Sequence, residues 1–139
     1  EEDIPVTIPA GMDNGEMIRM SSMGEAVPGG ITGDLYIKIH VKPHPKFKKE
    51  GTNLVTDLNI KLSDALLGGT HTLATLDGDI ELKIPESVSF GEILRIRGKG
   101  IPVERGKRGD LMVRLHIQLP NNLSKKAKRI VEDLREEGI

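Results

Sequence analysis

Apolar and polar residues alternate in short runs along most of this chain, which is the pattern of β-strands with one buried face. Residues 34–41 carry an aliphatic side chain at every second position, and residues 110–117 repeat the arrangement. The inward-facing sets are predicted to be Leu35, Ile37, Ile39 and Val41 in the first run, and Leu111, Val113, Leu115 and Ile117 in the second. Further strands are expected over residues 53–61, 70–76 and 80–84, the last two joined as a hairpin by Asp77-Gly78. The pattern predicts an all-β fold.

Helical spacing is clear only near the end of the sequence. After Ser124, a possible N-cap, four apolar residues follow i, i+3, i+4, i+7 and form one stripe: Ala127, Ile130, Val131 and Leu134. A helix of about 14 residues is marginal alone, so we expect the stripe to need a partner surface. A single helical turn is predicted over residues 63–69, with Ser63 as a possible N-cap and glycine at its end.

The sequence contains one segment twice. Residues 6–41 align without a gap on residues 82–117, at a constant offset of 76. Identical pairs include Ile8-Pro9 with Ile84-Pro85, Arg19 with Arg95, and Gly33-Asp34-Leu35 with Gly109-Asp110-Leu111. Two copies at so long a period suggest tandem duplicated domains. Residues 47–81 precede the second copy and have no counterpart before the first, so we expect a piece of a longer protein whose first unit is incomplete.

Two kinds of connection link the predicted strands. The glycine-rich segments 27–33 and 103–109 are expected to be long loops before the last strand of each copy. Lys42-Pro43-His44-Pro45 is expected to be a stiff linker between the copies, because each proline fixes φ and biases its predecessor towards extended backbone.

Composition narrows the class of protein. Apolar residues make up 37% and aromatic residues 2%, so the core must consist of Leu, Ile and Val with Met as filler. A net charge of -1 supplies no electrostatic attraction for nucleic acid. The absence of cysteine fits a reducing compartment, and no stretch reaches the roughly 18 apolar residues of a membrane span. We expect a cytoplasmic protein that binds neither nucleic acid nor membrane.

Several clusters resemble chemical sites without completing one. Asp77-Gly78-Asp79 suggests a calcium loop, but the rest of such a loop is missing and a hairpin turn is the simpler interpretation. Gly98-Lys99-Gly100 lacks the spacing and the Ser/Thr of a phosphate-binding loop. The histidines at 40, 44, 71 and 116 are scattered, which favours solvated positions over a metal site. Spacing assembles no Ser-His-Asp set, and a sugar-active β-sandwich is disfavoured without paired carboxylates, so we predict no enzyme activity.

The terminal helix carries an unusual distribution of charge. Its first half is basic, with Lys125, Lys126, Lys128 and Arg129, and its second half is acidic, with Glu132, Asp133, Glu136 and Glu137. A solvated helix with i, i+4 ion pairs is the simplest account. The same distribution opposes the helix dipole, so packing must hold this helix in place.

Four runs in fixed order resemble the C-terminal region of the DnaJ family of J-domain co-chaperones. They read GDLYIKIHVKPHPKFKKEGTNL, DALLGGTHTLATLDG, LKIPESVSFGEILRIRGKGIP and RGDLMVRLHIQLP, and the resemblance covers essentially the whole chain. In that family, two β-sandwich-like domains follow one another and a C-terminal helical segment joins two protomers. The resemblance implies that residues 1–42 are the rear half of the first domain, 43–120 the second domain, and 121–139 the dimerisation helix.

The resemblance also implies which family parts are missing from the sequence. The His-Pro-Asp motif of the J-domain, which stimulates ATP hydrolysis by DnaK, has no match, because His44-Pro45 is followed by Lys46. The paired CxxC motifs of the zinc-binding insert are missing too. We therefore expect no cofactor in this fragment, with zinc in a full-length parent of the zinc-insert class.

Two functions follow as hypotheses. The first is a non-enzymatic scaffold that binds extended, apolar segments of unfolded clients and serves a DnaK-type chaperone in protein folding. Its expected client groove lies near Leu58, Ile60, Leu73 and Leu76, although each of these could simply be a core residue. The second is a structural module that forms a homodimer through Ala127, Ile130, Val131 and Leu134 and binds no client itself.

Overall fold

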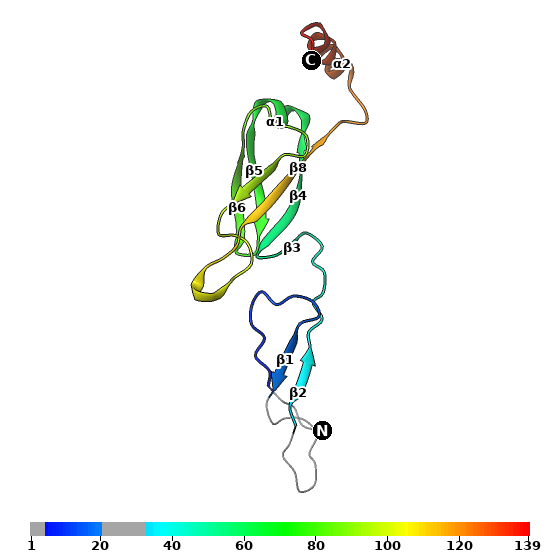
Figure 1. The fold of residues 1–139 in the computed structure, drawn as a ribbon. Coiled ribbons are helices and arrows are strands. Elements are labelled where there is room, and N and C mark those ends of the chain that lie inside the picture. The colour runs from blue at the N-terminus through cyan, green and yellow to red at the C-terminus, as the bar shows by residue number, and fades with distance from the viewer. Residues whose placement is uncertain (1–4, 21–32) are drawn as a thin grey trace. The chain divides into compact units, whose positions relative to one another are not determined.

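A computed structural model describes residues 5–20 and 33–139, and β-strands dominate it (Figure 1). The strands are β1 (Met17–Met20), β2 (Leu35–Lys38), β3 (Lys48–Glu50), β4 (Asn53–Lys61), β5 (Gly69–Thr75), β6 (Gly78–Ile84), β7 (Ile93–Ile96) and β8 (Leu111–Gln118). The helices are α1 (Leu62–Leu67), the single 3-10 turn η1 (Glu104–Gly106) and α2 (Lys125–Glu136). The predicted all-β class with a C-terminal helix is confirmed.

Three sheets organise the described strands. β1 pairs with β2, β5 pairs with β6, and a four-stranded sheet has the order β3-β4-β8-β7. The predicted hairpin through Asp77-Gly78 is confirmed, because β5 ends at Thr75 and β6 begins at Gly78. The backbone N–H of Asp77 donates to the Thr75 hydroxyl at 3.2 Å, which tightens the connection.

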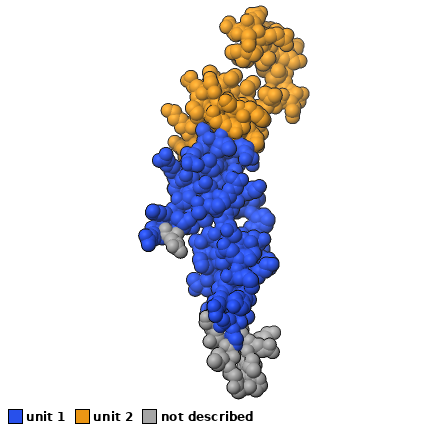
Figure 2. Space-filling view, viewed as in Figure 1, with its two compact units in different colours: residues 1–57, 75–77, 93–114 blue, residues 58–74, 78–92, 115–139 orange. Residues whose placement is uncertain are grey.

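The chain divides into two compact units (Figure 2). Unit 1 comprises residues 1–57, 75–77 and 93–114, and unit 2 comprises residues 58–74, 78–92 and 115–139. Strands β4 and β8 contribute residues to both units. The domain boundaries expected near residues 42 and 120 follow from the sequence repeat and stay a prediction.

Unit 1 has its core on the first half of β4 and on β8. The buried aliphatic residues are Leu54, Val55, Leu111 and Val113. Thr56 is also buried, and its hydroxyl donates to the carbonyl oxygen of Lys46 at 2.9 Å. Successive side chains of a strand point to opposite faces, so three buried residues in a row show that both faces of β4 are covered here.

Unit 2 has its own core, which consists of Ile60, Ala65, Leu73, Leu82, Ile84 and Leu115. Helix α1 lies beside it and begins at Leu62, with Lys61 as an N-cap that offers no side-chain hydrogen bond. The prediction that Ser63 caps this helix is therefore wrong, because the aliphatic residue Leu62 already belongs to its first turn. The predicted glycine end is confirmed at Gly68.

Helix α2 follows the sequence prediction closely. The Ser124 hydroxyl accepts a hydrogen bond from the Ala127 N–H at 3.0 Å, which confirms the predicted N-cap. The helix has 12 residues, slightly fewer than the predicted 14, and none of them is buried.

The sequence repeat is also a repeat of backbone pairing. In the first copy, β1 and β2 pair antiparallel from Met17 with Lys38 to Met20 with Leu35. In the second copy, β7 and β8 pair from Ile93 with Arg114 to Ile96 with Leu111. Every partner in the second ladder lies 76 positions after its counterpart in the first. The ladders also share a further bond, Ile39 N–H to Glu16 O at 2.8 Å and Leu115 N–H to Glu92 O at 2.9 Å.

Candidate functional site

A large, mainly apolar hollow lies in unit 1 and is called here the unit-1 pocket. Its volume is about 740 Å³. Its apolar lining includes Val41, Pro43, Phe47, Leu54, Leu76 and Ile101. Val41 and Leu76 are 47% and 50% exposed, so large apolar side chains face solvent at this site. A concave apolar surface with exposed aliphatic side chains is suited to binding another apolar group.

Three lysines give the unit-1 pocket a basic rim. Lys42, Lys48 and Lys49 all line it, together with one carboxylate from Asp13. The Lys49 ammonium lies 2.6 Å from the Asp13 carboxylate and also donates to the Gly11 carbonyl oxygen. Lys49 therefore binds the loop before β1. Lys42 and Lys48 make no ion pair with another described residue.

Two further contacts fix the walls of the unit-1 pocket. The Asn14 side-chain oxygen accepts a hydrogen bond from the Val41 N–H at 2.9 Å, which ties the segment after β2 to the loop before β1. The rings of His44 and Phe47 lie 5.0 Å apart at a tilt, within the range of favourable ring contacts. These contacts position the predicted linker residues Lys42–Pro45, which belong to no strand or helix.

The structure separates the four residues predicted for the client groove. Ile60 and Leu73 are buried in the core of unit 2, Leu58 in the same unit is half-buried, and Leu76 lies in unit 1 and lines its pocket. The alternative that Ile60 and Leu73 serve the core is therefore favoured for these two. Sequence reasoning did not select Val41, Phe47 or Ile101. Phe47 carried a signal, because it is one of only two phenylalanines and follows the proline-rich linker.

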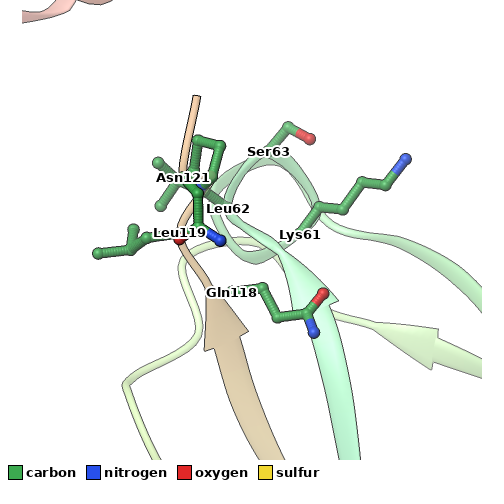
Figure 3. A pocket seen from close by; sticks show the side chains of 7 residues that line it. Lys61, Leu62, Ser63, Gln118, Leu119 and Asn121 are labelled. Atoms are coloured by element: carbon green, nitrogen blue, oxygen red, sulfur yellow. The ribbon is translucent and has the colours of Figure 1, made fainter. Parts of the chain in front are cut away.

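A second hollow, in unit 2, lies where β4 and β8 end (Figure 3). It measures about 660 Å³, and its lining includes Lys61, Leu62, Gln118, Leu119 and Asn121. Figure 3 shows Leu62 close to Leu119 and Asn121, whereas the amino group of Lys61 extends away from them. Its lining mixes polar and apolar groups, so it is a less suitable apolar binding site than the unit-1 pocket.

None of the predicted dimerisation residues on α2 is buried. Ile130 and Val131 are exposed, and Ala127 and Leu134 are half-buried. Among the described residues, no ion pair or side-chain hydrogen bond involves the charged side chains of this helix. The i, i+4 pairs expected from the sequence are thus not formed in the structure.

Asp77, at the tip of the β5–β6 hairpin, is held by two cations. Arg108 donates from its guanidinium to the Asp77 carboxylate, and Lys99 lies 3.7 Å from the same oxygen. Arg108 also donates to the Gly100 carbonyl oxygen from Nη2 at 2.8 Å. The hydrogen bond from Arg108 lowers the pKa of Asp77 below its ordinary value, and the charges of Arg108 and Lys99 act in the same direction. The predicted turn at Asp77-Gly78-Asp79 is therefore a hairpin turn whose Asp77 carboxylate pairs with the side chains of Arg108 and Lys99.

The remaining candidates from the sequence were the histidines and carboxylates considered as metal ligands. His71 Nε2 lies 3.1 Å from the Asp64 carboxylate, which joins β5 to α1 within unit 2. Within residues 5–20 and 33–139, no three His, Asp or Glu side chains gather as metal ligands. In the same part of the chain, no helix has the length and hydropathy to cross a bilayer.

Comparison with protein families decides the kinship of this chain. The family model of the DnaJ C terminal domain matches residues 1–120. The chain belongs to this family. The matched residues include both copies of the repeat and end before Ser124, the N-cap of α2. The DnaJ C terminal domain belongs to co-chaperones and is not an enzyme class.

Proposed function

We propose that this DnaJ C-terminal chain binds extended, apolar segments of unfolded polypeptides. The chain forms a homodimer and presents the bound segments to a DnaK-type chaperone. Binding requires no cofactor in this fragment and changes no covalent bond. The observation that carries the proposal is the unit-1 pocket, because it combines exposed aliphatic side chains with a segment of backbone outside any strand. An extended client can place alternate side chains in such a pocket while its main chain pairs alongside.

The proposed client surface keeps Leu76 from the sequence prediction and adds Val41 and Phe47. Leu58 remains a second candidate contact, in unit 2, because its side chain is only partly buried. Ile60 and Leu73 are proposed to act only indirectly, since buried side chains cannot touch a client without local opening.

Client binding is tested with a short, fluorescein-labelled peptide that has Leu and Val at alternate positions. Fluorescence anisotropy should rise on titration with the chain. The double substitution Val41→Asp and Leu76→Asp should weaken binding at least about tenfold, since burying the rest of each side chain is worth roughly 1 kcal/mol. Phe90→Asp is the matched control, because Phe90 is 77% exposed and does not line the pocket. Equal affinity of the double variant and the control would reject the unit-1 pocket, and a loss confined to Leu58→Asp would move the site to unit 2.

The dimer is proposed to form through the apolar stripe of α2: Ala127, Ile130, Val131 and Leu134. No residue of this 12-residue amphipathic helix is buried, and a helix of this length is marginal alone, which supports the proposal that a second chain covers the stripe. Replacing Ile130 and Leu134 with Asp should halve the mass seen by sedimentation equilibrium. The same mass before and after substitution would contradict the proposal.

A purely structural dimerisation module is the alternative. It shares the α2 prediction but requires that the labelled peptide bind neither unit. The anisotropy titration therefore separates the two functions, because only the client-binding scaffold predicts saturation with peptide.

A further inference from the structure

Positive charge gathers around the unit-1 pocket. Three lysines line it with a single carboxylate, from Asp13, although the whole chain has a net charge of -1. The Asp13 carboxylate is already paired with Lys49. Lys42 and Lys48 are exposed, and neither forms an ion pair with a residue that the structure describes. The basic rim therefore carries two ammonium groups that no described carboxylate neutralises.

Two other polar side chains that line the pocket also offer hydrogen-bond donors. The Asn14 side-chain oxygen accepts the Val41 N–H, so its NH2 group remains to donate. His44 Nδ1 accepts the Lys46 N–H at 3.0 Å, so the neutral imidazole carries its proton on Nε2. These remaining donors have no partner among residues 5–20 and 33–139. The pocket thus offers donors and positive charge to a bound group, and its one carboxylate is already used.

We propose that the unit-1 pocket selects client segments in which Asp or Glu lies within about two residues of a large apolar side chain. The apolar side chain enters the pocket beside Val41, Phe47 and Leu76, and the carboxylate reaches Lys42 or Lys48. An extended chain rises about 3.3 Å per residue, a separation that a lysine side chain can span. This inference rests on the proposed client binding and adds the chemistry of the segments that are bound.

Charge complementarity supports this choice of occupant. An ionised carboxylate is a pure acceptor, and its hydrogen bonds with ammonium groups are stronger than those between neutral groups. A client with Lys or Arg next to the apolar residue would bring like charges together at the basic rim. The net charge of the whole chain acts in the opposite direction, because an acidic chain weakly repels acidic peptides. A preference for acidic clients would therefore arise at the pocket and not from the overall charge.

Lys42 should contribute more to this preference than Lys48. Lys48 also lines a smaller hollow together with Glu50 and Asp57, although it pairs with neither. Two carboxylates nearby lower the positive potential at Lys48 and compete with a client for its ammonium group. Lys42 lies at the unit-1 pocket, where the one carboxylate is already paired.

Competition between peptides tests the selection. Three unlabelled competitors share alternating Leu and Val residues and carry Glu, Ser or Lys at the positions between them. Each displaces the fluorescein-labelled Leu/Val peptide, so the label is the same in every titration. At low ionic strength the Glu peptide should compete at about five- to tenfold lower concentration than the Lys peptide, with the Ser peptide between them. High salt should bring the three together, because it screens exposed charges.

Variants of the basic rim locate the source of the preference. Lys42→Gln with Lys48→Gln removes both charges and keeps the side-chain length, so the three competitors should come within about twofold of one another. Lys42→Gln alone should remove more of the difference than Lys48→Gln alone. Lys83→Gln with Lys125→Gln is the matched control and should keep the preference for Glu. Both of these lysines are exposed, lie outside the pocket and form no ion pair with a described residue.

The outcomes separate this inference from the client binding on which it rests. Equal competition by the Glu, Ser and Lys peptides against the wild type would overturn the charge selection and leave client binding intact. A preference for Glu that persists in the double Gln variant would also overturn it, because the carboxylates would then bind elsewhere. Absence of binding by the labelled peptide itself would reject the proposed function, and this inference with it.

Discussion

The two copies of the repeat share a backbone pairing but differ in burial. Ile8 of the first copy is 59% exposed, whereas its counterpart Ile84 is 1% exposed. Leu35 and Ile37 are half-buried, but their counterparts Leu111 and Val113 are fully buried. The two copies thus have the same register although they differ in burial. The burial of the second copy depends on residues 47–81, which precede it and supply β3, β4, α1 and β5.

The comparison also explains the chemistry at the loops. Both copies join an Arg to an Asp at the same positions, Arg19 with Asp34 and Arg95 with Asp110. Lys99 and Arg108 of the second copy pair with Asp77, and the sequence has Met23 and Thr32 at the corresponding positions of the first copy. The shared contact joins residues of the repeat, and the added contact joins two residues of the second copy to Asp77, which lies outside the repeat.

The largest expected effect is a difference in stability between substitutions of the equivalent residues Ile84 and Ile8. Ile84→Ala should lower the free energy of unfolding by about 2–5 kcal/mol, since it removes a fully buried side chain from the core of unit 2. Ile8→Ala should change it by less than about 0.5 kcal/mol, as for most exposed positions. Urea unfolding followed by circular dichroism measures both. Similar losses for the two variants would show that the first copy has a core of its own.

A second pair of counterparts has positive φ in both copies. Gly11 has φ of +81°, and a Cβ there would lie 2.9 Å from the Pro102 carbonyl oxygen. We expect Gly11→Ala to lower stability by about 1–3 kcal/mol, through left-handed strain and this contact. Ser87 already has φ of 55°, so Ser87→Gly should stay within about 0.5 kcal/mol of the wild type. Thermal unfolding of the two variants tests this, and a tolerated Gly11→Ala would contradict the loop geometry.

The repeated ion pairs should contribute little. Arg19 Nε donates to Asp34 at 2.7 Å, and Arg95 Nε lies 3.5 Å from Asp110, but both arginines are more than half exposed. Each Arg→Ala substitution should lower stability by less than about 1 kcal/mol, and added salt should reduce the difference. Asp110→Ala should have a larger effect than Arg95→Ala, because Asp110 also accepts the Gly98 N–H at 3.1 Å. A larger loss of stability for Arg95→Ala than for Asp110→Ala, measured by urea unfolding, would show that the hydrogen bond from Gly98 adds nothing to the ion pair.

The smallest expected effect is a dependence on pH in the second copy alone. Because the folded state lowers the pKa of Asp77, its contacts with Arg108 and Lys99 stabilise the fold above the ordinary range of an aspartate. This contribution is lost as pH falls through the lowered pKa, below about 4. The amide shifts of Gly100 and Arg108 should report the transition in the wild type but not in Asp77→Asn. A transition of equal size in the variant would exclude Asp77 as its source.

Sequence periodicity predicted the strands well because the buried faces are regular. The bounds of β4 and the Asp77-Gly78 hairpin match the expectation, and the Ser124 cap and α2 follow from local rules. The predicted run 34–41 shortens to β2 because Val41 is half exposed and its N–H bonds to Asn14. The start of α1 was predicted wrongly because serine is common at N-caps but a helix does not require a capping side chain. The helix begins at Leu62, and Lys61 at its N-cap makes no side-chain hydrogen bond.

The candidate site was harder to predict than the fold. Ile60 and Leu73 satisfy the same period-two pattern whether they face a groove or a core, so sequence cannot distinguish these roles. The unit-1 pocket combines Val41 and Phe47 with Leu76 and Ile101, which lie far away in the sequence. No local period connects such residues, and only the structure shows that they share a pocket.

The central claim is that this chain binds clients at the unit-1 pocket and that its two repeat copies differ in burial. Hydrogen exchange with and without the alternating Leu/Val peptide tests this claim most directly. Without peptide, amides of β8 should exchange far more slowly than amides of β2. With saturating peptide, protection should rise over residues 41–49 and at Leu76 and stay unchanged in β8. Equal protection of β2 and β8, or no added protection over residues 41–49, would contradict the account.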